Sequence, residues 1–205
     1  MNDEIEVLEL FPAIVSTRSL GHDAEFQQRL RKHILATREL DRKGLSKSNV
    51  GGWHSHRLQG PVIDTLELAI LRHAEDYARR MAWDLVRFRV SLTDDGLWAV
   101  INSKGTTNAL HIHQRAHLSG VYYVRTPKGS GDLIFEAPRP PHAERGPVLA
   151  QQTLKNVERL AAKPREGMLV LFPSWLPHRV GPNQGDEERI AVSFNISLVA
   201  HEGVA

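Results

Sequence analysis

The sequence predicts an α+β domain that is mainly β, in which two helices support an antiparallel sandwich whose natural closure is a jelly roll. Apolar residues recur with clear helical spacing in two stretches of the first 85 residues. The chain beyond that point reads as short apolar strands separated by glycine and proline turns. We expect one domain over residues 1–205, with helical support in 1–85 and the β core in 86–199.

Two stretches carry the helical spacing. Asp23 is suited to cap a helix that runs to about Leu40, and Pro61 stands where the first turn of a second helix tolerates a proline. A polar loop over residues 42–56 would join the two helices. The residues expected on the inner faces are Phe26, Leu30, Ile34 and Leu35, followed by Val62, Leu66, Ile70, Ala74, Tyr77 and Met81.

The strand signals begin near the N-terminus. Residues 4–15 mix β-branched and apolar side chains around a proline, which indicates an edge strand or a strand pair. The stretch 138–164 interrupts the later strand rhythm and is expected to contain a short helix around 153–160. The strands of the β core are expected at 86–92, 97–103, 118–125, 133–135, 168–172 and 190–199.

Composition removes several classes of protein. The chain has no cysteine, so disulfides, thiolate nucleophiles and cysteine metal sites are excluded, and a metal would need His, Asp or Glu. The start is acidic rather than basic and no apolar run approaches a membrane span, which predicts a cytoplasmic protein without membrane partners. The net charge of +2 comes from scattered basic residues, so a nucleic-acid partner is not expected. A homodimer is left open.

Histidines in the second half of the chain form a candidate metal site. His111 and His113 are two positions apart in a strand-like setting, and strand alternation would send both side chains to one face. Taken alone, such a pair more often contains an ordinary hydrogen-bonded histidine. A third histidine, His178, follows the buried strand at 168–172 after a turn that contains two prolines.

A buried cation accompanies the histidines. Arg189 opens the last predicted strand, shares a face with Ser193 and Asn195, and needs an anionic partner in such an apolar setting. Iron that activates oxygen needs three protein ligands on one face, with open positions for a chelating 2-oxoacid and for O₂. Arginine offers the distal carboxylate of 2-oxoglutarate a planar bidentate partner. Together these residues indicate a site for Fe(II) and 2-oxoglutarate, although each of them alone is a weak signal.

Three segments of the chain resemble the jelly-roll, or double-stranded β-helix, superfamily of 2-oxoglutarate/Fe(II) oxygenases, and in particular a small group found in bacteria and phages. They are HIHQRAHLSGVYYV (111–124), GMLVLFPSWLPHRV (167–180) and RIAVSFN (189–195), with a looser match at SNVGGWHS (48–55). The resemblance implies a dioxygenase that hydroxylates an unidentified small-molecule or peptidyl substrate. By position it implies His111 as first ligand, His178 as distal ligand and Arg189 as the anchor of the co-substrate.

The second ligand position departs from the superfamily, where most members have Asp or Glu and this chain has His113. A three-histidine face changes the ligand charge by one unit and is closer to that of cysteine-dioxygenase-type cupins. Two alternatives exist: Glu136, on the strand over residues 131–136, could reach the metal, or His117 could replace one of the pair. Both rank below His113, because Glu136 has no spacing argument and His117 lies at the start of the neighbouring strand.

Supporting roles are expected for several polar or aromatic residues. Asn102 and Asn108 flank the histidine pair, and Tyr123 would either hydrogen-bond a co-substrate carboxylate or be a packed core tyrosine. Trp175 would either lie beside the distal ligand or pack in the core, and the loop at 48–55 would either close over substrate or be an ordinary turn. The residues expected to bind the co-substrate are Arg189, Ser193, Asn195, Tyr123, Asn102 and Asn108.

Three functions compete at this stage. The first is the 2-oxoglutarate-dependent dioxygenase. The second is a three-histidine cupin-like enzyme that does not use 2-oxoglutarate, in which Arg189 contacts the substrate or makes a structural ion pair. The third is a non-catalytic jelly-roll binding module. A zinc hydrolase ranks lower, because no general-base carboxylate is positioned by the sequence.

Overall fold

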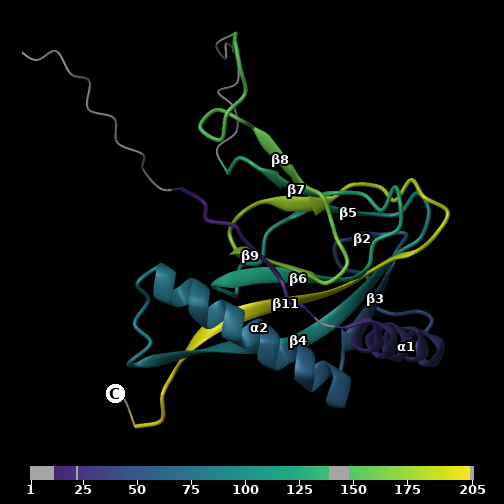
Figure 1. Cartoon of the computed structure of the whole chain (residues 1–205), viewed down its shortest axis with the longest axis horizontal. Coiled ribbons are helices and arrows are strands. Elements are labelled where there is room, and N and C mark those ends of the chain that lie inside the picture. The colour runs from purple at the N-terminus through teal and green to yellow at the C-terminus, as the bar shows by residue number, and fades with distance from the viewer. Residues whose placement is uncertain (1–11, 22, 139–147, 204–205) are drawn as a thin grey trace, which may run out of the picture.

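The computed structural model describes residues 12–21, 23–138 and 148–203, and it contains two stacked antiparallel sheets with two helices on one side (Figure 1). The larger sheet has, in spatial order, β1 (Ser16–Ser19), β9 (Met168–Pro173), β6 (Leu118–Arg125), β11 (Arg189–Ala200), β4 (Phe88–Asn102) and β3 (Trp53–Arg57). The smaller sheet has β2 (Asn49–Val50), β5 (Thr107–His111), β10 (His178–Val180), β7 (Leu133–Glu136) and β8 (Arg159–Ala162). The expected jelly-roll sandwich is confirmed.

Both predicted helices are present, as α1 (Ala24–Leu40) and α2 (Pro61–Arg80), and both pack on the larger sheet. Asp23 caps α1 as expected, because its carboxylate accepts a hydrogen bond from the Phe26 N–H at 2.7 Å. The expected inner face of α2 is right except at its two ends. Val62 is only partly buried, and Met81 lies past the last helical turn and is 38% exposed.

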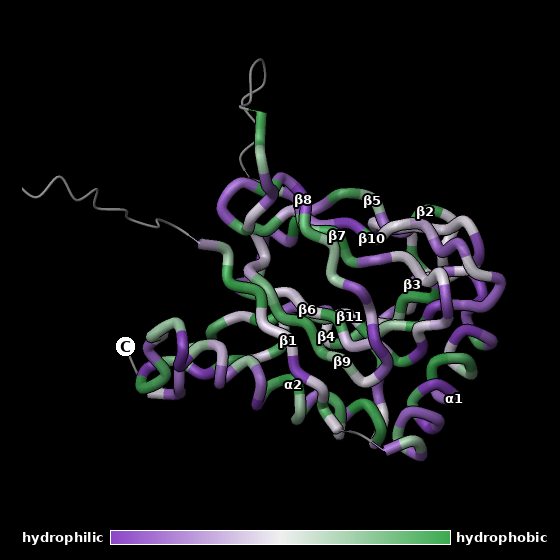
Figure 2. Tube along the Cα trace, turned by 45° about the horizontal axis from the view of Figure 1, so that its top comes forward, coloured by the Kyte–Doolittle hydropathy of each residue, from purple (hydrophilic) through white to green (hydrophobic). Residues whose placement is uncertain are grey.

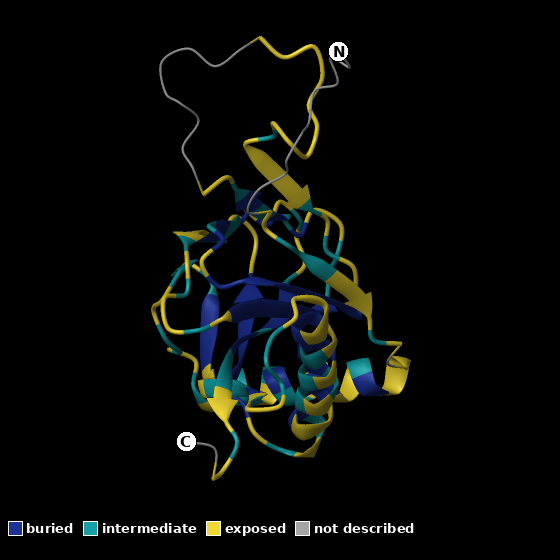
Figure 3. Cartoon of the chain, turned by 90° about the vertical axis from the view of Figure 1, so that its left-hand side faces the viewer, coloured by how far each residue is buried: buried dark blue, intermediate teal, exposed yellow. Residues whose placement is uncertain are grey.

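The sheets divide the core into two apolar clusters. One lies between the helices and the larger sheet, and the other lies between the two sheets. Strand β6 shows the division, because Tyr122 and Val124 belong to the first cluster while Val121 and Tyr123 belong to the second. Figure 2 shows the apolar strands at the centre, and Figure 3 shows their burial. Odd-numbered residues of β11, such as Ala191, therefore face the smaller sheet.

Several predicted boundaries are wrong. The strands expected at 86–92 and 97–103 are one strand, β4, since a bulge opposite β11 accommodates the polar residues around Asp94 and Gly96 without ending the strand. The loop expected at 42–56 contains β2 and most of β3, whose polar sequences conceal strand alternation. The helix expected around 153–160 is a turn followed by β8, which pairs with β7 along its whole length.

The prediction at the N-terminus lies partly outside the described residues, which begin at residue 12. Residues 12–15 have no regular structure, and the first strand is β1, which pairs with β9. Among the described residues, neither helix has the length and apolar character needed to cross a membrane.

Candidate metal centre

Three histidines meet where β5 and β10 run side by side in the smaller sheet. His111 ends β5, His178 begins β10, and the two stand opposite each other in the ladder with ring centroids 4.3 Å apart. The His113 ring is 5.0 Å from that of His111 and 5.3 Å from that of His178. One ring nitrogen from each residue lies within 4.8 Å of the others, the one such group of potential ligands that the described residues form.

Strand alternation, which was expected to bring His111 and His113 to one face, does not explain this convergence. His111 and His113 do not share a strand, since β5 ends at His111. The backbone N–H of His113 instead donates to the Ser174 carbonyl at 2.9 Å, which ties the segment after β5 to the turn before His178. That bond, rather than strand alternation, brings the His113 side chain to the other two.

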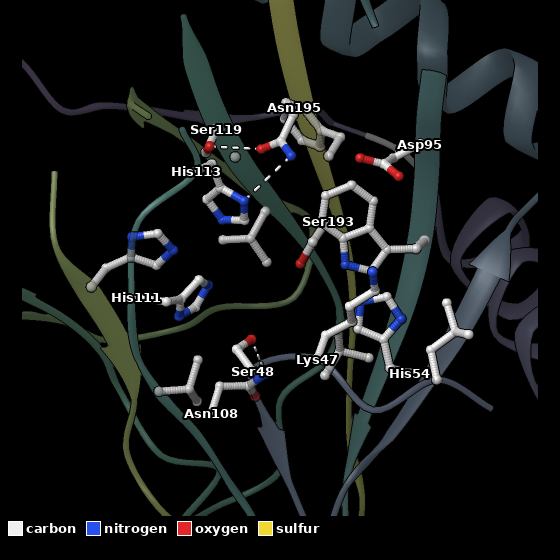
Figure 4. A pocket seen from close by; sticks show the side chains of 18 of the residues that line it. Lys47, Ser48, His54, Asp95, Asn108, His111, His113, Ser119, Ser193 and Asn195 are labelled. Carbon is white, nitrogen blue, oxygen red and sulfur yellow. Dashed lines mark hydrogen bonds between the residues drawn. The ribbon is translucent and has the colours of Figure 1, made fainter. Parts of the chain in front are cut away.

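Hydrogen bonds at the Nδ1 atoms orient the rings. His111 Nδ1 lies 2.7 Å from the Ala109 carbonyl oxygen, and His178 Nδ1 lies 2.9 Å from that of Leu176. A carbonyl only accepts, so both Nδ1 atoms carry a hydrogen and both Nε2 lone pairs are free to bind a metal. The third Nδ1, of His113, lies 3.3 Å from the amide nitrogen of Asn195 (Figure 4).

The electrostatic setting keeps these rings neutral, which is the form that binds metal. Burial, together with the charge that His111 would carry, lowers the pKa of His178 to about 3 and the pKa of His113 to about 4. Burial also lowers the pKa of His111. Three uncharged nitrogen donors in one place suit a borderline divalent ion such as Fe(II).

The alternative second ligands lie elsewhere. Glu136 accepts a hydrogen bond from Arg179 Nε at 2.8 Å, and Arg159 Nε is 3.6 Å from the same oxygen. The His117 ring packs against Trp83, and its Nδ1 accepts a bond from a backbone N–H. Neither side chain belongs to the histidine cluster, so the geometry favours His113 as the second ligand.

A buried arginine, Arg189, lines a cavity that the three histidines also line. Arg189 is 2% exposed, its Nη1 donates to Asn102 Oδ1 at 2.8 Å, and its guanidinium lies 5.2 Å from the centre of the Tyr123 ring. Arg189 Nε and the Tyr123 hydroxyl are both buried without a hydrogen-bond partner. Burial raises the pKa of Tyr123, so its hydroxyl stays protonated. A buried cation with an unused Nε–H donor fits a carboxylate from outside the chain.

A cavity of about 780 Å³ between the sheets joins the histidines to the arginine. Its opposite wall contains Trp98 and His54, whose rings stack at 5.7 Å and 12°. Figure 4 shows Asp95 and Lys47 on the wall away from His111. This volume is typical of a small-molecule pocket, with the metal ligands on one wall and aromatic and charged groups on the other.

Most of the predicted site residues line this cavity. They are His111, His113, His178, Arg189, Ser193, Asn195 and Asn108. Two others lie behind Arg189 and act on its guanidinium: Asn102, which accepts its hydrogen bond, and Tyr123, which packs on it. Trp175 is 48% exposed, so the interpretation that it packs in the core is wrong.

Sequence reasoning gave no individual role to several residues of the cavity wall, although His54 lies in the loop 48–55 that was considered as a cover over substrate. Ser119 lies within an apolar strand and gives no signal by itself, while Trp98 and His54 meet only because β3 pairs with β4. Lys47 and Asp95 lie in polar stretches that look like solvent-exposed loops in the sequence. Only the three-dimensional structure brings these residues to the cavity that the histidines line.

Known proteins resemble both the sequence and the fold of this region. A family model described as "Putative 2OG-Fe(II) oxygenase" matches residues 96–195, which include all three histidines and Arg189. No curated protein matches the chain. A prolyl-4-hydroxylase from Pseudomonas putida is 16% identical, with a TM-score of 0.60 over 88% of this chain and 91% of that one.

Two further solved structures share the architecture. HygX from Streptomyces hygroscopicus, solved with nickel, 2-oxoglutarate and hygromycin B, is 13% identical with a TM-score of 0.58 over 89% of this chain and 82% of its own. A prolyl hydroxylase from Trichoplax adhaerens, in complex with a hypoxia inducible factor peptide, is 12% identical with a TM-score of 0.62 over 89% and 83%. At identities this low, the three structural matches show that the fold is shared and nothing more.

Proposed function

We propose that this chain, a member of the 2-oxoglutarate/Fe(II) oxygenase superfamily, is a non-haem iron dioxygenase that hydroxylates a small-molecule or peptidyl substrate. The observation that carries the proposal is the sharing of one cavity by three converging imidazoles and a buried arginine with no carboxylate partner among the described residues. Bound together there, Fe(II), 2-oxoglutarate and O₂ would supply the oxidation that places a hydroxyl group on a substrate C–H bond.

In this proposal His111, His113 and His178 hold the ion and Arg189 binds the distal carboxylate of 2-oxoglutarate. Asn102 fixes the direction of the guanidinium, and the Tyr123 ring packs against it. Three neutral ligands leave the full charge of a divalent ion at the site, whereas a carboxylate ligand would cancel part of it. A dianionic co-substrate is therefore attracted both by the metal and by Arg189.

The substrate would lie between the metal and the wall formed by Trp98, His54 and Asp95. His54 Nδ1 is 2.7 Å from the Ser55 carbonyl, so in the neutral ring Nε2 is a hydrogen-bond acceptor. Burial lowers the pKa of His54, which favours that neutral form. This wall suits a substrate with a flat or apolar face and a donor group. HygX, solved with hygromycin B, and the Trichoplax prolyl hydroxylase, solved with a peptide, are structural neighbours that support a small-molecule and a peptidyl substrate respectively.

Three further predictions stay with the proposal and rest on the sequence alone. The chain is expected to act as one domain over residues 1–205 and to work in the cytoplasm. A homodimer remains an open prediction.

The presence of His113 in place of a carboxylate favours a second candidate, the three-histidine cupin-like enzyme that does not use 2-oxoglutarate. Anaerobic titration with Fe(II), with and without 2-oxoglutarate, separates the two functions. A visible metal-to-ligand charge-transfer band that needs both components supports the first. Iron binding without such a band, at any 2-oxoglutarate concentration, supports the second.

A further inference from the structure

The three histidines differ in what holds their rings. For His111 and His178 the partner of Nδ1 is the backbone carbonyl two residues earlier, at Ala109 and Leu176. These carbonyls belong to the same short segments as the rings, so the two orientations are set locally. His113, which lies beyond the end of β5, has no such bond, and its Nδ1 faces the side chain of Asn195 at 3.3 Å.

Asn195 is itself held by a second side chain. It lies on β11 opposite Ser119 of β6, and the Ser119 hydroxyl donates to Asn195 Oδ1 at 2.7 Å. Ser119 is 1% exposed and Asn195 is 7% exposed, and both line the cavity. Figure 4 shows the two bonds as one chain that runs from Ser119 through Asn195 to His113. His113, the one ring of the three whose Nδ1 has no backbone carbonyl as partner, is thus connected to the larger sheet through the buried side chains of Asn195 and Ser119.

The direction of these bonds decides whether His113 can bind metal through Nε2. With Asn195 Nδ2 donating, His113 Nδ1 accepts, and the ring hydrogen of a neutral imidazole then occupies Nε2. For Nε2 to bind an ion, Nδ1 must carry the hydrogen and donate to Oδ1. A half-turn of the amide achieves this, and the Ser119 hydroxyl accommodates it because a hydroxyl can accept as well as donate.

We infer that Asn195, held by Ser119, is a positioning residue that orients the His113 ring and sets which of its nitrogens faces the metal. The inference depends on the proposed function only in requiring that the histidines bind a divalent ion. Partners of this kind behind a ligating histidine typically change metal affinity by about 10- to 100-fold. The pair therefore performs for His113 what the backbone carbonyls perform for the other two rings.

Two substitutions at Asn195 separate this role from simple packing. Asn195→Ala removes the partner of Nδ1, whereas Asn195→Asp offers an acceptor to both Ser119 and His113, so no half-turn is needed. The probe is Co(II), titrated into the whole metal-free chain and followed by its visible absorption, which reports ligand geometry as well as affinity. Ser197→Ala is the matched control, since Ser197 lies on β11 two positions later and outside the cavity.

We expect Asn195→Ala to bind Co(II) about 10- to 100-fold more weakly, with an altered absorption spectrum. Asn195→Asp should bind at least as tightly as wild type, and Ser197→Ala should match it. Wild-type affinity and spectrum in Asn195→Ala, or equally weak binding by the Asp and Ala variants, would overturn the inference. If Asn195→Ala fails to fold, as judged by thermal denaturation without metal, Ser119→Ala replaces it. That variant should also lose affinity, and unchanged affinity would count against the inference.

The same titration distinguishes this inference from the proposed function. If wild type binds Co(II) but shows no response to 2-oxoglutarate, the proposed function fails while the role of Asn195 is still tested by the variants. If wild type binds no divalent ion, the metal centre and the inference fall together.

Discussion

The guanidinium of Arg189 donates a hydrogen bond to Asn102 Oδ1, 2.8 Å away, across the rung of the β11–β4 ladder in which these two residues are paired. The register of two long strands therefore sets the direction of the cation. The guanidinium packs against the ring of Tyr123, and Arg189 lines the same cavity as the three histidines. Arg189 Nε has no partner in this arrangement, which leaves a buried donor for a ligand.

Replacement of Arg189 by Ala should weaken 2-oxoglutarate binding, because a charge-assisted bidentate contact is lost in a buried setting. The expected cost is about 2–5 kcal/mol, or about 30- to several-thousand-fold in affinity. Arg189→Lys should recover only part of it, since an ammonium cannot reproduce the planar fork. The measurement is 2-oxoglutarate affinity in the Fe(II)-loaded, oxygen-free protein, with iron content determined in every variant. Unchanged affinity in Arg189→Ala would support the three-histidine enzyme instead.

Asn102→Ala should weaken 2-oxoglutarate binding less than Arg189→Ala does, because the cation remains but loses the bond that directs it. One hydrogen bond to a charged group contributes about 1.5–3 kcal/mol, so a loss of roughly 10- to 150-fold is expected. Isothermal titration with 2-oxoglutarate measures it. A loss equal to that in Arg189→Ala would mean that Asn102 does more than orient the guanidinium, for example by holding β4 against β11.

Loss of one histidine from the cluster should abolish stoichiometric Fe(II) binding, since two ligands do not make a facial site. We expect this for His111→Ala, His113→Ala and His178→Ala, with circular dichroism showing a retained fold. Glu136→Ala should bind iron like wild type, because its carboxylate pairs with Arg179 outside the cluster. One equivalent of iron in His113→Ala together with none in Glu136→Ala would reverse the assignment of the second ligand.

Much of the fold could be predicted because apolar residues recur along the chain in the patterns typical of helices and buried strands. The helices have apolar residues at intervals of three to four positions, and strands such as β6 and β9 are rich in apolar residues and buried along almost their whole length. The prediction failed where structure depends on pairing rather than composition. Strand β3 contains two histidines and an arginine in five residues, and it is a strand because it pairs with β4.

The same difference between local pattern and strand pairing explains which site residues could be predicted. His111, His178 and Arg189 could be found because a histidine pair, a histidine after a buried strand and an arginine at the start of the last strand form a recognisable combination in the sequence. His113 was placed correctly for an incorrect reason, since its position depends on a backbone bond to Ser174 that no local pattern encodes. Ser119 could not be found at all, because its partner Asn195 is far away in the sequence and only the β6–β11 register joins them.

Gly120 should not tolerate a side chain, although its backbone conformation is ordinary. A methyl group there would overlap the Phe194 ring and come within 2.7 Å of the Val170 carbonyl oxygen. Gly120→Ala is therefore expected to lower the free energy of unfolding by about 1–3 kcal/mol, the usual cost of overpacking. Gly181→Ala is the matched control, since its added methyl group would meet its neighbours at ordinary contact distances. Chemical denaturation measures both, and equal stabilities would show that Phe194 moves aside freely.

The metal-free protein should lose stability as the pH falls from about 6.5 towards 3, and His178 should account for part of the loss. Burial, with the charge of His111, lowers its folded-state pKa to about 3, whereas the unfolded value is near 6.5. Between these values the unfolded chain binds the extra proton, so the free energy of unfolding decreases by about 1.4 kcal/mol per pH unit for this group. Above 6.5 the ring is neutral in both states and contributes no slope. His178→Ala should remove this share, so the stability difference between wild type and variant should shrink as the pH is lowered. Urea denaturation from pH 7.5 to 4 tests it, and parallel pH profiles would show that His178 is not held neutral by its surroundings.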